Sequence, residues 1–395
     1  TPKVVVAGAS GFIGQAIGKA LGEQIELTGL SRRDRQASGG YAAFRRADLF
    51  SLRDAECALE GADQVIYLVH SMMPSARLVQ GHFGDLDLLC ADNVARAAAS
   101  NGVKQIIYVG GLVPEEDDLS EHLESRLEVE RTLSSKGVPV TALRAGLVVG
   151  AAGSSFQILH RLVRRLPVML CPSWTRTRMG PVDLRVVVEA VNRVIQEPAQ
   201  DNRVYDLGDP NAVSYQELMA ATARALNLHR RFVPIGLLSP SLSRLWVSMT
   251  TGAPRALVAP LIESLRHEMI PRRDPQWRLA GLPHIPLEDM LAHAAHEANA
   301  VRDEPLAFQS PKPRGGKDTV RSVQRMRLPE GRDARWAAEE YVKWLPRALP
   351  GVLSVSRDDT SDITQFHLSS ARLGPVLLRL HHRRTRSESS RQVFR

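Results

Sequence analysis

The stretch Val6–Gly14, VAGASGFIG, places glycines at positions 8, 11 and 14, directly after the apolar run 3–8 and at the start of a helical pattern. In a strand–turn–helix unit, Gly8 permits a tight turn, Gly11 lets the backbone approach a pyrophosphate, and Gly14 lets the helix pack on the sheet. The helix N-terminus favours negative charge. We therefore predict a dinucleotide site, and expect its loop to comprise Gly8, Ser10, Gly11, Phe12, Ile13 and Gly14.

Further buried strands are predicted where β-branched residues form nearly continuous apolar runs, at 25–31, 64–70, 105–111 and 140–146. Such runs are typical of parallel strands that helices cover on both faces. Segments with helical periodicity separate them. The alternation predicts an α/β fold with a doubly wound parallel sheet, the Rossmann arrangement.

The character of the chain changes after Gly150, where basic and proline-rich segments follow. We predict a nucleotide-binding domain, a small and mostly helical substrate lobe, a linker and a C-terminal α+β domain. Their expected bounds are 1–150 plus 183–208, 151–182 plus 209–300, 301–318, and 319–395. In the last domain we expect the order β-α-β-β, with strands in 319–329, 363–370 and 374–384 and a helix over 333–349.

Charge is unevenly distributed in a chain of net charge +8. Residues 309–395 contain 18 of the 51 basic residues but only 9 of the 43 acidic ones. A basic region of this kind can contact an anionic partner. It lacks the interleaved aromatic residues of a stacking platform, so nucleic acid is not favoured.

The three scattered cysteines, Cys57, Cys90 and Cys171, form no CxxC pair, which argues against a disulfide framework or a zinc site. No secretory leader is visible, and no apolar run reaches the roughly 18 residues of a membrane helix. We expect a cytoplasmic protein with no transmembrane segment and no metal.

The end of the second strand indicates which dinucleotide binds. Ser31, Arg32 and Arg33 stand where an NAD site usually offers a carboxylate. Because guanidinium groups suit a 2′-phosphate, we predict NADP(H) over NAD(H). Asp48 follows the third strand at a position suited to the adenine amine. We expect Leu49 beside it, and Val69 at the end of the fourth strand, to line the cofactor site.

His122 and Arg126 are four residues apart in a helical segment and so lie on one face of the helix. His70 ends the fourth strand, near the expected nicotinamide end of the cofactor. These three residues are the catalytic candidates.

Several motifs are similar to those of a known group of proteins. The chain resembles the short-chain dehydrogenase/reductase superfamily in its extended and atypical branch, with its NmrA-like and epimerase/dehydratase relatives. More narrowly, it resembles bacterial NAD(P)-binding proteins with a C-terminal domain of the DUF2867 type. The motifs are YLVHSM (67–72), YVGGL (108–112), LSEHLESRLEVE (119–130), TALRAGLVVGAAGSSF (141–156), LPVMLCPSW (166–174) and RMGPVD (178–183).

The resemblance implies that the helix at 119–132 occupies the place of the family's Tyr-x-x-x-Lys pair. His122 then falls in the tyrosine slot and Arg126 in the lysine slot, while the supporting Ser or Thr falls on Gly110 or Gly111. All three parts of the usual machinery are changed, so the tyrosine mechanism cannot operate.

Three hypotheses remain open. In the first, His122 is the general acid of a hydride-transfer reductase, with Arg126 holding the ribose. In the second, the protein binds NAD(P)H without turnover and reports redox state, as the NmrA-like relatives imply. In the third, His122 and Arg126 are ordinary helix residues and another group, His70, serves any reaction.

The substrate is expected to be a small apolar carbonyl or enone held under the substrate lobe. The residues that suggest an apolar pocket are Phe156, Met169, Leu170, Trp174, Leu245, Trp246 and Met249. The resemblance further implies a homodimer formed through helices such as 83–101 and 120–135.

Overall fold

The computed structural model describes residues 2–70, 83–114, 119–234 and 267–300, with short strands at 324–325, 354–360, 363–369 and 393–394. The chain divides into two compact units. One comprises Thr1–Thr251 and Arg255–Ala307, and the other comprises Gly252–Pro254 and Phe308–Arg395. The expected linker, 301–318, lies outside the described residues.

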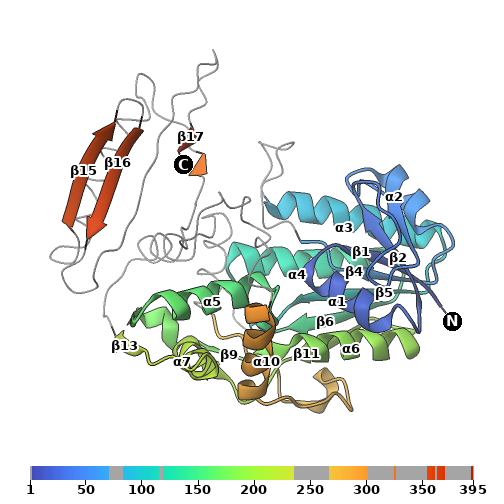
Figure 1. Cartoon of the computed structure of the whole chain (residues 1–395). Helices are drawn as coiled ribbons and strands as arrows, with labels where there is room; N and C mark the ends of the chain where they lie inside the picture. Colours follow the sequence, from blue (N-terminus) through green and yellow to red (C-terminus); the bar gives the residue numbers. More distant parts are fainter. Residues whose placement is uncertain are drawn as a thin grey trace. The chain divides into compact units, whose positions relative to one another are not determined.

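A seven-stranded parallel sheet forms the centre of the first unit, in the order β11-β6-β5-β4-β1-β2-β3 (Figure 1). Its strands are β1 (Lys3–Ala7), β2 (Glu26–Ser31), β3 (Ala43–Arg46), β4 (Gln64–Tyr67), β5 (Gln105–Gly111), β6 (Val140–Ala145) and β11 (Arg203–Leu207). The strand order reverses between β1 and β4, the place where open α/β sheets bind ligands. The predicted doubly wound α/β fold is confirmed.

Helices cover both faces of this sheet (Figure 1). The helices α1 (Phe12–Leu21) and α6 (Leu184–Gln196) cover one face, and α2 (Leu52–Leu59), α3 (Phe83–Ser100) and α4 (Glu121–Leu133) cover the other. Alternation along β1 divides its side chains between the two cores. Val4 and Val6 pack toward α1 and α6, while Val5 and Ala7 pack toward α2, α3 and α4.

The remaining elements of the first unit follow β6 and extend over the carboxyl ends of the strands. Short paired strands join β7 (Val148–Val149) to β10 (Val182–Asp183), β8 (Val168–Cys171) to β13 (Arg231–Pro234), and β9 (Arg178–Met179) to β12 (Val213–Ser214). The helices are α5 (Ser154–Arg165), α7 (Tyr215–Ala225) and α10 (Leu287–Ala300), with 3-10 turns η1 (Ser134–Lys136), η2 (Ser173–Arg176) and η3 (Pro275–Trp277).

The second unit contains two antiparallel strand pairs among its described residues. They join β15 (Ser354–Thr360) to β16 (Ile363–Ser369) and β14 (Gln324–Arg325) to β17 (Val393–Phe394). The strands β14 and β16 lie in segments expected to be strands. The strand β15 was not expected, because SVSRDDT has little apolar content and is ordered by pairing with its partner. The expected helix 333–349 and strand 374–384 lie outside the described residues.

All three cysteines are unpaired. Within the described part of the chain, no group of His, Cys, Asp or Glu has the makings of a metal site. Among the same residues, no helix is both long and apolar enough to cross a membrane.

We predict that Gly14→Ala destabilises the first unit, although alanine normally favours a helix by up to about 1 kcal/mol. A Cβ at Gly14 would lie 2.4 Å from the Gly8 carbonyl oxygen and 2.7 Å from the Ala9 Cα, and both contacts are backbone. Overpacking of this kind costs about 1–3 kcal/mol. Urea unfolding measures the loss. Gly111→Ala is the control, because apart from its chain neighbours no atom of the described residues lies within 4 Å of the added methyl group. Equal stability of the two variants would contradict the expectation.

Candidate functional site

The turn between β1 and α1 has the geometry that a dinucleotide requires. Gly8 has a φ of +93°, and its carbonyl oxygen accepts the Gly11 N–H at 2.9 Å. Gly11 is the N-cap of α1 and offers no capping side chain. The first N–H groups of α1 therefore face the turn without a side-chain partner and suit the diphosphate of a dinucleotide.

The other residues of the loop differ in their surroundings. Ser10 is exposed, and Ile13 is partly buried against the core beneath α1. Phe12 packs where α5 begins, since a Cβ at Gly150 would lie 2.7 Å from its ring and a Cβ at Gly153 would lie 3.0 Å from it. The glycine loop thus contacts the start of the first helix after β6.

Ser31, Arg32 and Arg33 lie at the end of β2, next to β1 in the sheet. The Ser31 hydroxyl accepts the Arg33 N–H at 3.2 Å, and both arginines are exposed beyond it. Their charges are therefore available to a ligand at the carboxyl edge of the sheet.

The loop after β3 is fixed by polar contacts. The Asp48 carboxylate accepts the Phe50 N–H at 3.2 Å, and the Asp48 N–H donates to Asp54 at 3.2 Å. Asn93 on α3 is only 6% exposed and donates its side-chain N–H to the Leu49 carbonyl at 2.9 Å. Asn93 could not be predicted from the sequence, because its role depends on a contact 44 residues away.

The helix α4 is held against the sheet along its length. Ser120 caps it by accepting the Leu123 N–H at 3.4 Å. The Tyr108 hydroxyl on β5 donates to the Arg126 carbonyl at 3.2 Å. Toward the end of the helix, Glu130 accepts two hydrogen bonds from Arg144 on β6, at 2.8 and 2.9 Å. These contacts fix where the candidate residues of α4 project.

Arg126 forms a buried ion pair with Asp87 of α3, through one guanidinium nitrogen and the Asp87 Oδ2. Their side chains are 8% and 3% exposed. Charges so far removed from water persist only when they are paired, because desolvation costs several kcal/mol for each ion. Arg126 is therefore a buried cation directed at α3.

His70 and His122 meet at the same place. The His70 Nδ1 lies 3.2 Å from the Asp87 Oδ2, the oxygen that Arg126 also contacts. The His70 and His122 rings have centroids 5.2 Å apart. Val69, which precedes His70, is partly buried against the sheet core. The three catalytic candidates thus form one cluster with Asp87, at the carboxyl ends of β4 and β5.

Both histidines of this cluster are poor bases. Burial lowers the pKa of His122 to about 4, helped by the charges of His70 and Arg126 and opposed by Asp87. Burial also lowers the pKa of His70, and the hydrogen bond that its ring donates to Asp87 opposes that shift. Both rings are accordingly neutral at pH 7.

No tyrosine takes over the missing slot within the described residues. Tyr67 and Tyr108 are the nearest, with rings 6.2 Å apart and at most 1% exposed. Burial raises the pKa of both hydroxyls. The position expected for the supporting Ser or Thr also lacks a hydroxyl, because it is a glycine. A Cβ at Gly110 would lie 2.6 Å from the Tyr108 ring, whereas Gly111 has open space.

Asp87 is the residue that sequence reasoning missed. It is one of two acidic residues in the first turns of α3, the other being the exposed Asp85. Helical spacing would have placed Asp87 with Cys90, Ala91 and Val94 on the buried face, and an acidic residue there calls for a partner. The partner, Arg126, could not be read from that spacing.

The apolar residues expected around the substrate are only partly described. Phe156 and Met169 are fully buried, and the Trp174 ring packs on Tyr215 with centroids 5.6 Å apart. Leu245, Trp246 and Met249, together with the side chain of Leu170, lie outside the described residues.

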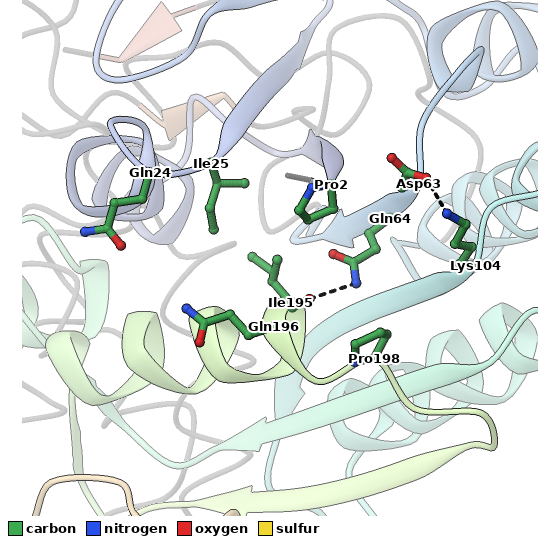
Figure 2. A pocket seen from close by; sticks show the side chains of 9 residues that line it. All are labelled: Pro2, Gln24, Ile25, Asp63, Gln64, Lys104, Ile195, Gln196 and Pro198. Atoms are coloured by element: carbon green, nitrogen blue, oxygen red, sulfur yellow. Dashed lines mark hydrogen bonds and ion pairs between the residues drawn. The ribbon is translucent and has the colours of Figure 1, made fainter.

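A cavity of about 650 Å³ opens at the amino ends of the sheet strands, opposite the candidate site (Figure 2). It is lined by the amino ends of the strands and the end of α6. Figure 2 shows the Gln64 side chain donating to the Ile195 carbonyl, at 3.1 Å, beside the Asp63–Lys104 ion pair. Because ligands of open α/β sheets bind at the carboxyl ends of the strands, this cavity is separate from the candidate site.

Residues 8–161 match a protein family described as NAD(P)H-binding. The match runs from the glycine loop into α5 and supports NAD(P)H binding by this part of the chain. The match begins at the first glycine of the loop and includes Asp48, His70, Asp87 and Arg126. The glycine turn and the uncapped start of α1 fit the cofactor that the family binds.

Two curated proteins resemble the chain. The auxiliary protein GraX of Staphylococcus aureus is 30% identical over 112 residues, which are 28% of this chain and 36% of GraX. The chain thus spans about a third of the length of GraX. Sanguinarine reductase of Eschscholzia californica is 25% identical over 248 residues, which are 52% of this chain and 88% of the reductase.

Among solved structures, the triphenylmethane reductase of Citrobacter sp., complexed with NADP(H), matches with a TM-score of 0.59. The identity is 18%, and the match covers 74% of this chain and 100% of the reductase. At that identity the likeness shows a shared fold. Together these comparisons support a resemblance to NAD(P)H-binding proteins of this fold, while the DUF2867-type domain stays a prediction.

We predict that removing one partner of the buried ion pair between Asp87 and Arg126 costs about 3–5 kcal/mol. Arg126→Met removes the cation that contacts the buried Asp87 carboxylate. The double variant Arg126→Met/Asp87→Leu removes both charges and should recover much of the loss. Urea unfolding of both single variants and the double variant completes the cycle. Additive losses would show that the two charges do not depend on each other.

We predict that the first unit loses stability as the pH falls from about 6.5 toward 4. The unfolded chain protonates His122 near pH 6.5, but burial holds the folded pKa at about 4, so protons favour the unfolded state in this window. The contribution should be about 2 kcal/mol between about pH 7 and pH 5. Urea unfolding of His122→Asn should show a weaker pH dependence, whereas His229→Asn, at an exposed histidine, should match the wild type. If the free energy of unfolding changed equally with pH in both variants, the expectation would be contradicted.

Proposed function

We propose that the protein is an atypical NADP(H)-dependent reductase that transfers hydride to a small apolar carbonyl or enone without a Tyr-x-x-x-Lys pair. The observation that carries this proposal is the cluster of His70, His122, Arg126 and Asp87 at the carboxyl ends of β4 and β5. It lies where the strand order reverses beside the glycine loop. The 25% identity to a sanguinarine reductase over 88% of that protein adds support.

NADP(H) is proposed over NAD(H) because of Arg32 and Arg33. Both are exposed at the end of β2, and no carboxylate stands between Ser31 and Arg33 to bond a ribose hydroxyl. A 2′-phosphate would find two guanidinium groups and the Ser31 hydroxyl there. Asp48 and Leu49 are proposed to contact the adenine, and Val69 to line the path to the nicotinamide.

The bound cofactor would supply hydride, and the residues of this chain would position the acceptor and manage the proton. A neutral imidazole such as that of His122 can present a ring N–H to a carbonyl oxygen. Arg126 is assigned a supporting role, since its guanidinium is 8% exposed and directed at Asp87. A guanidinium that is buried and paired in this way holds neighbouring side chains in position and has little exposed surface with which to bind a ribose. Within the described residues, no hydroxyl replaces the missing serine at Gly110 or Gly111.

The second candidate function is NAD(P)H binding without turnover, as in a redox-sensing protein. Two observations favour it. The pKa values of His70 and His122 lie below their usual range, so neither ring is a ready acid at neutral pH. The glycine loop and the Arg32–Arg33 pair would serve binding equally well.

We predict that Arg32→Ala weakens NADPH binding by about tenfold or more and leaves NADH binding unchanged, because only NADPH carries a 2′-phosphate. Nucleotide fluorescence titrations measure both affinities. Arg203→Ala is the matched control. It removes the same charge from the amino end of β11, at the opposite edge of the sheet from β2 and β3. Equal losses for NADPH and NADH would overturn the NADP(H) assignment.

A panel of acetophenone, 2-cyclohexenone and menadione then separates the two functions. Oxidation of NADPH with any of them supports the reductase. Tight NADPH binding with no turnover supports the binding protein.

A further inference from the structure

The hydrogen bond between His70 and Asp87 fixes the tautomer of the His70 ring. It does not fix the tautomer of His122. A carboxylate only accepts hydrogen bonds, so the His70 Nδ1, 3.2 Å from the Asp87 Oδ2, must carry the proton. In the neutral ring the lone pair then lies on Nε2. His70 is held in one tautomer with a proton-accepting atom on the far side of the ring.

His122 has no such orientation. Among the described residues its ring contacts His70, with centroids 5.2 Å apart, but no hydrogen bond holds either of its nitrogens. It occupies the tyrosine slot by sequence, yet nothing in the described structure selects its tautomer. The residue that the motif favours and the residue that the geometry favours are therefore different.

Exposure separates the members of the cluster further. The side chains of Asp87 and Arg126 are 3% and 8% exposed, whereas that of His70 is 27% exposed. The ion pair is thus the buried part of the cluster, and His70 is more accessible to a ligand than either of its members. A buried carboxylate behind an imidazole both orients the ring and stabilises the imidazolium that forms when the ring takes up a proton.

We propose that His70 is the catalytic proton carrier of this site, that Asp87 is its positioning residue, and that His122 only lines the site. The proposal rests on the proposed function, since it assigns the proton of that reaction. In the reducing direction, hydride from NADPH forms the C–H bond of the product. The Nε2–H bond of the His70 imidazolium breaks, and its proton forms the product hydroxyl.

In the oxidising direction the same atoms move in reverse. The alcohol O–H bond breaks, His70 Nε2 takes the proton, and NADP⁺ takes the hydride as the C=O bond forms. Atoms and electrons balance in both directions, and the His70 proton exchanges with solvent between turnovers. Because the ring is neutral at pH 7, the resting site is set to accept a proton from an alcohol.

The test begins with kcat/KM against pH for the full chain, using the carbonyl panel with NADPH and 1-phenylethanol with NADP⁺. The groups that act on His70 are Asp87 from α3 and Arg126 and His122 from α4. Reduction should fall, and oxidation should rise, as the pH increases through a pKa below 6.5. His70→Ala should lower kcat by about 10²–10⁴, remove that pKa from both profiles and regain activity with added imidazole. His122→Ala should keep the pKa of the profile and lower kcat less than His70→Ala does.

Asp87→Asn tests the positioning role, because an amide leaves the ring free to take the wrong tautomer. We expect kcat to fall with little change in KM. Since this variant also loses the charge that pairs with Arg126, ¹⁵N NMR of the wild-type histidines supplies a measurement that does not depend on its folding. The His70 signal, assigned from its loss in His70→Ala, should show a protonated Nδ1.

The outcomes are distinguishable. An active wild type whose kcat falls with His122→Ala and not with His70→Ala, or a His70 protonated at Nε2, would overturn the proposal while the proposed function stands. A wild type that binds NADPH and reduces nothing in the panel would overturn the proposed function, and the catalytic role of His70 with it.

Discussion

The contact between Asp87 and Arg126 is the interaction on which the candidate site depends. Withdrawing either charge from water costs several kcal/mol, and the contact between the two charges offsets part of that cost. The pair therefore fixes α3 against α4 at one point. Since His70 bonds to the same carboxylate oxygen, the end of β4 is tied to that point as well. Three segments that are far apart in the sequence are therefore held together at one carboxylate.

Local patterns revealed the fold because they report on neighbours in the chain. Gly8, Gly11 and Gly14 lie close together in the sequence, and their spacing alone indicated a strand, a tight turn and a helix. The same holds for the apolar runs of the sheet. Asp87 and Asn93 are different, since their partners lie 39 and 44 residues away. No spacing rule connects such residues, and only the packing of α3 against its neighbours brings them together. The strand β15 escaped prediction for a related reason, because its order comes from pairing with β16.

The motif around His122 predicted the position of this residue but not its chemical role. Its place on the helix was predicted, and the structure brings it to His70 and Arg126 as one cluster. The chemical role did not follow from that place. A tyrosine and a histidine in one slot differ in what orients them, and the described surroundings of His122 offer no orienting group. The buried carboxylate that could orient an imidazole contacts His70 instead.

The packing of Phe12 has a consequence for how sequences of this kind change over time. Its ring fills the space that side chains at Gly150 and Gly153 would occupy, so three positions of two distant segments share one small volume. A smaller residue at 12 would leave a void, and a larger residue at 150 or 153 would displace the ring from the glycine loop. Substitutions at these positions should therefore arise together, as correlated changes between the cofactor loop and the first helix that follows the sheet.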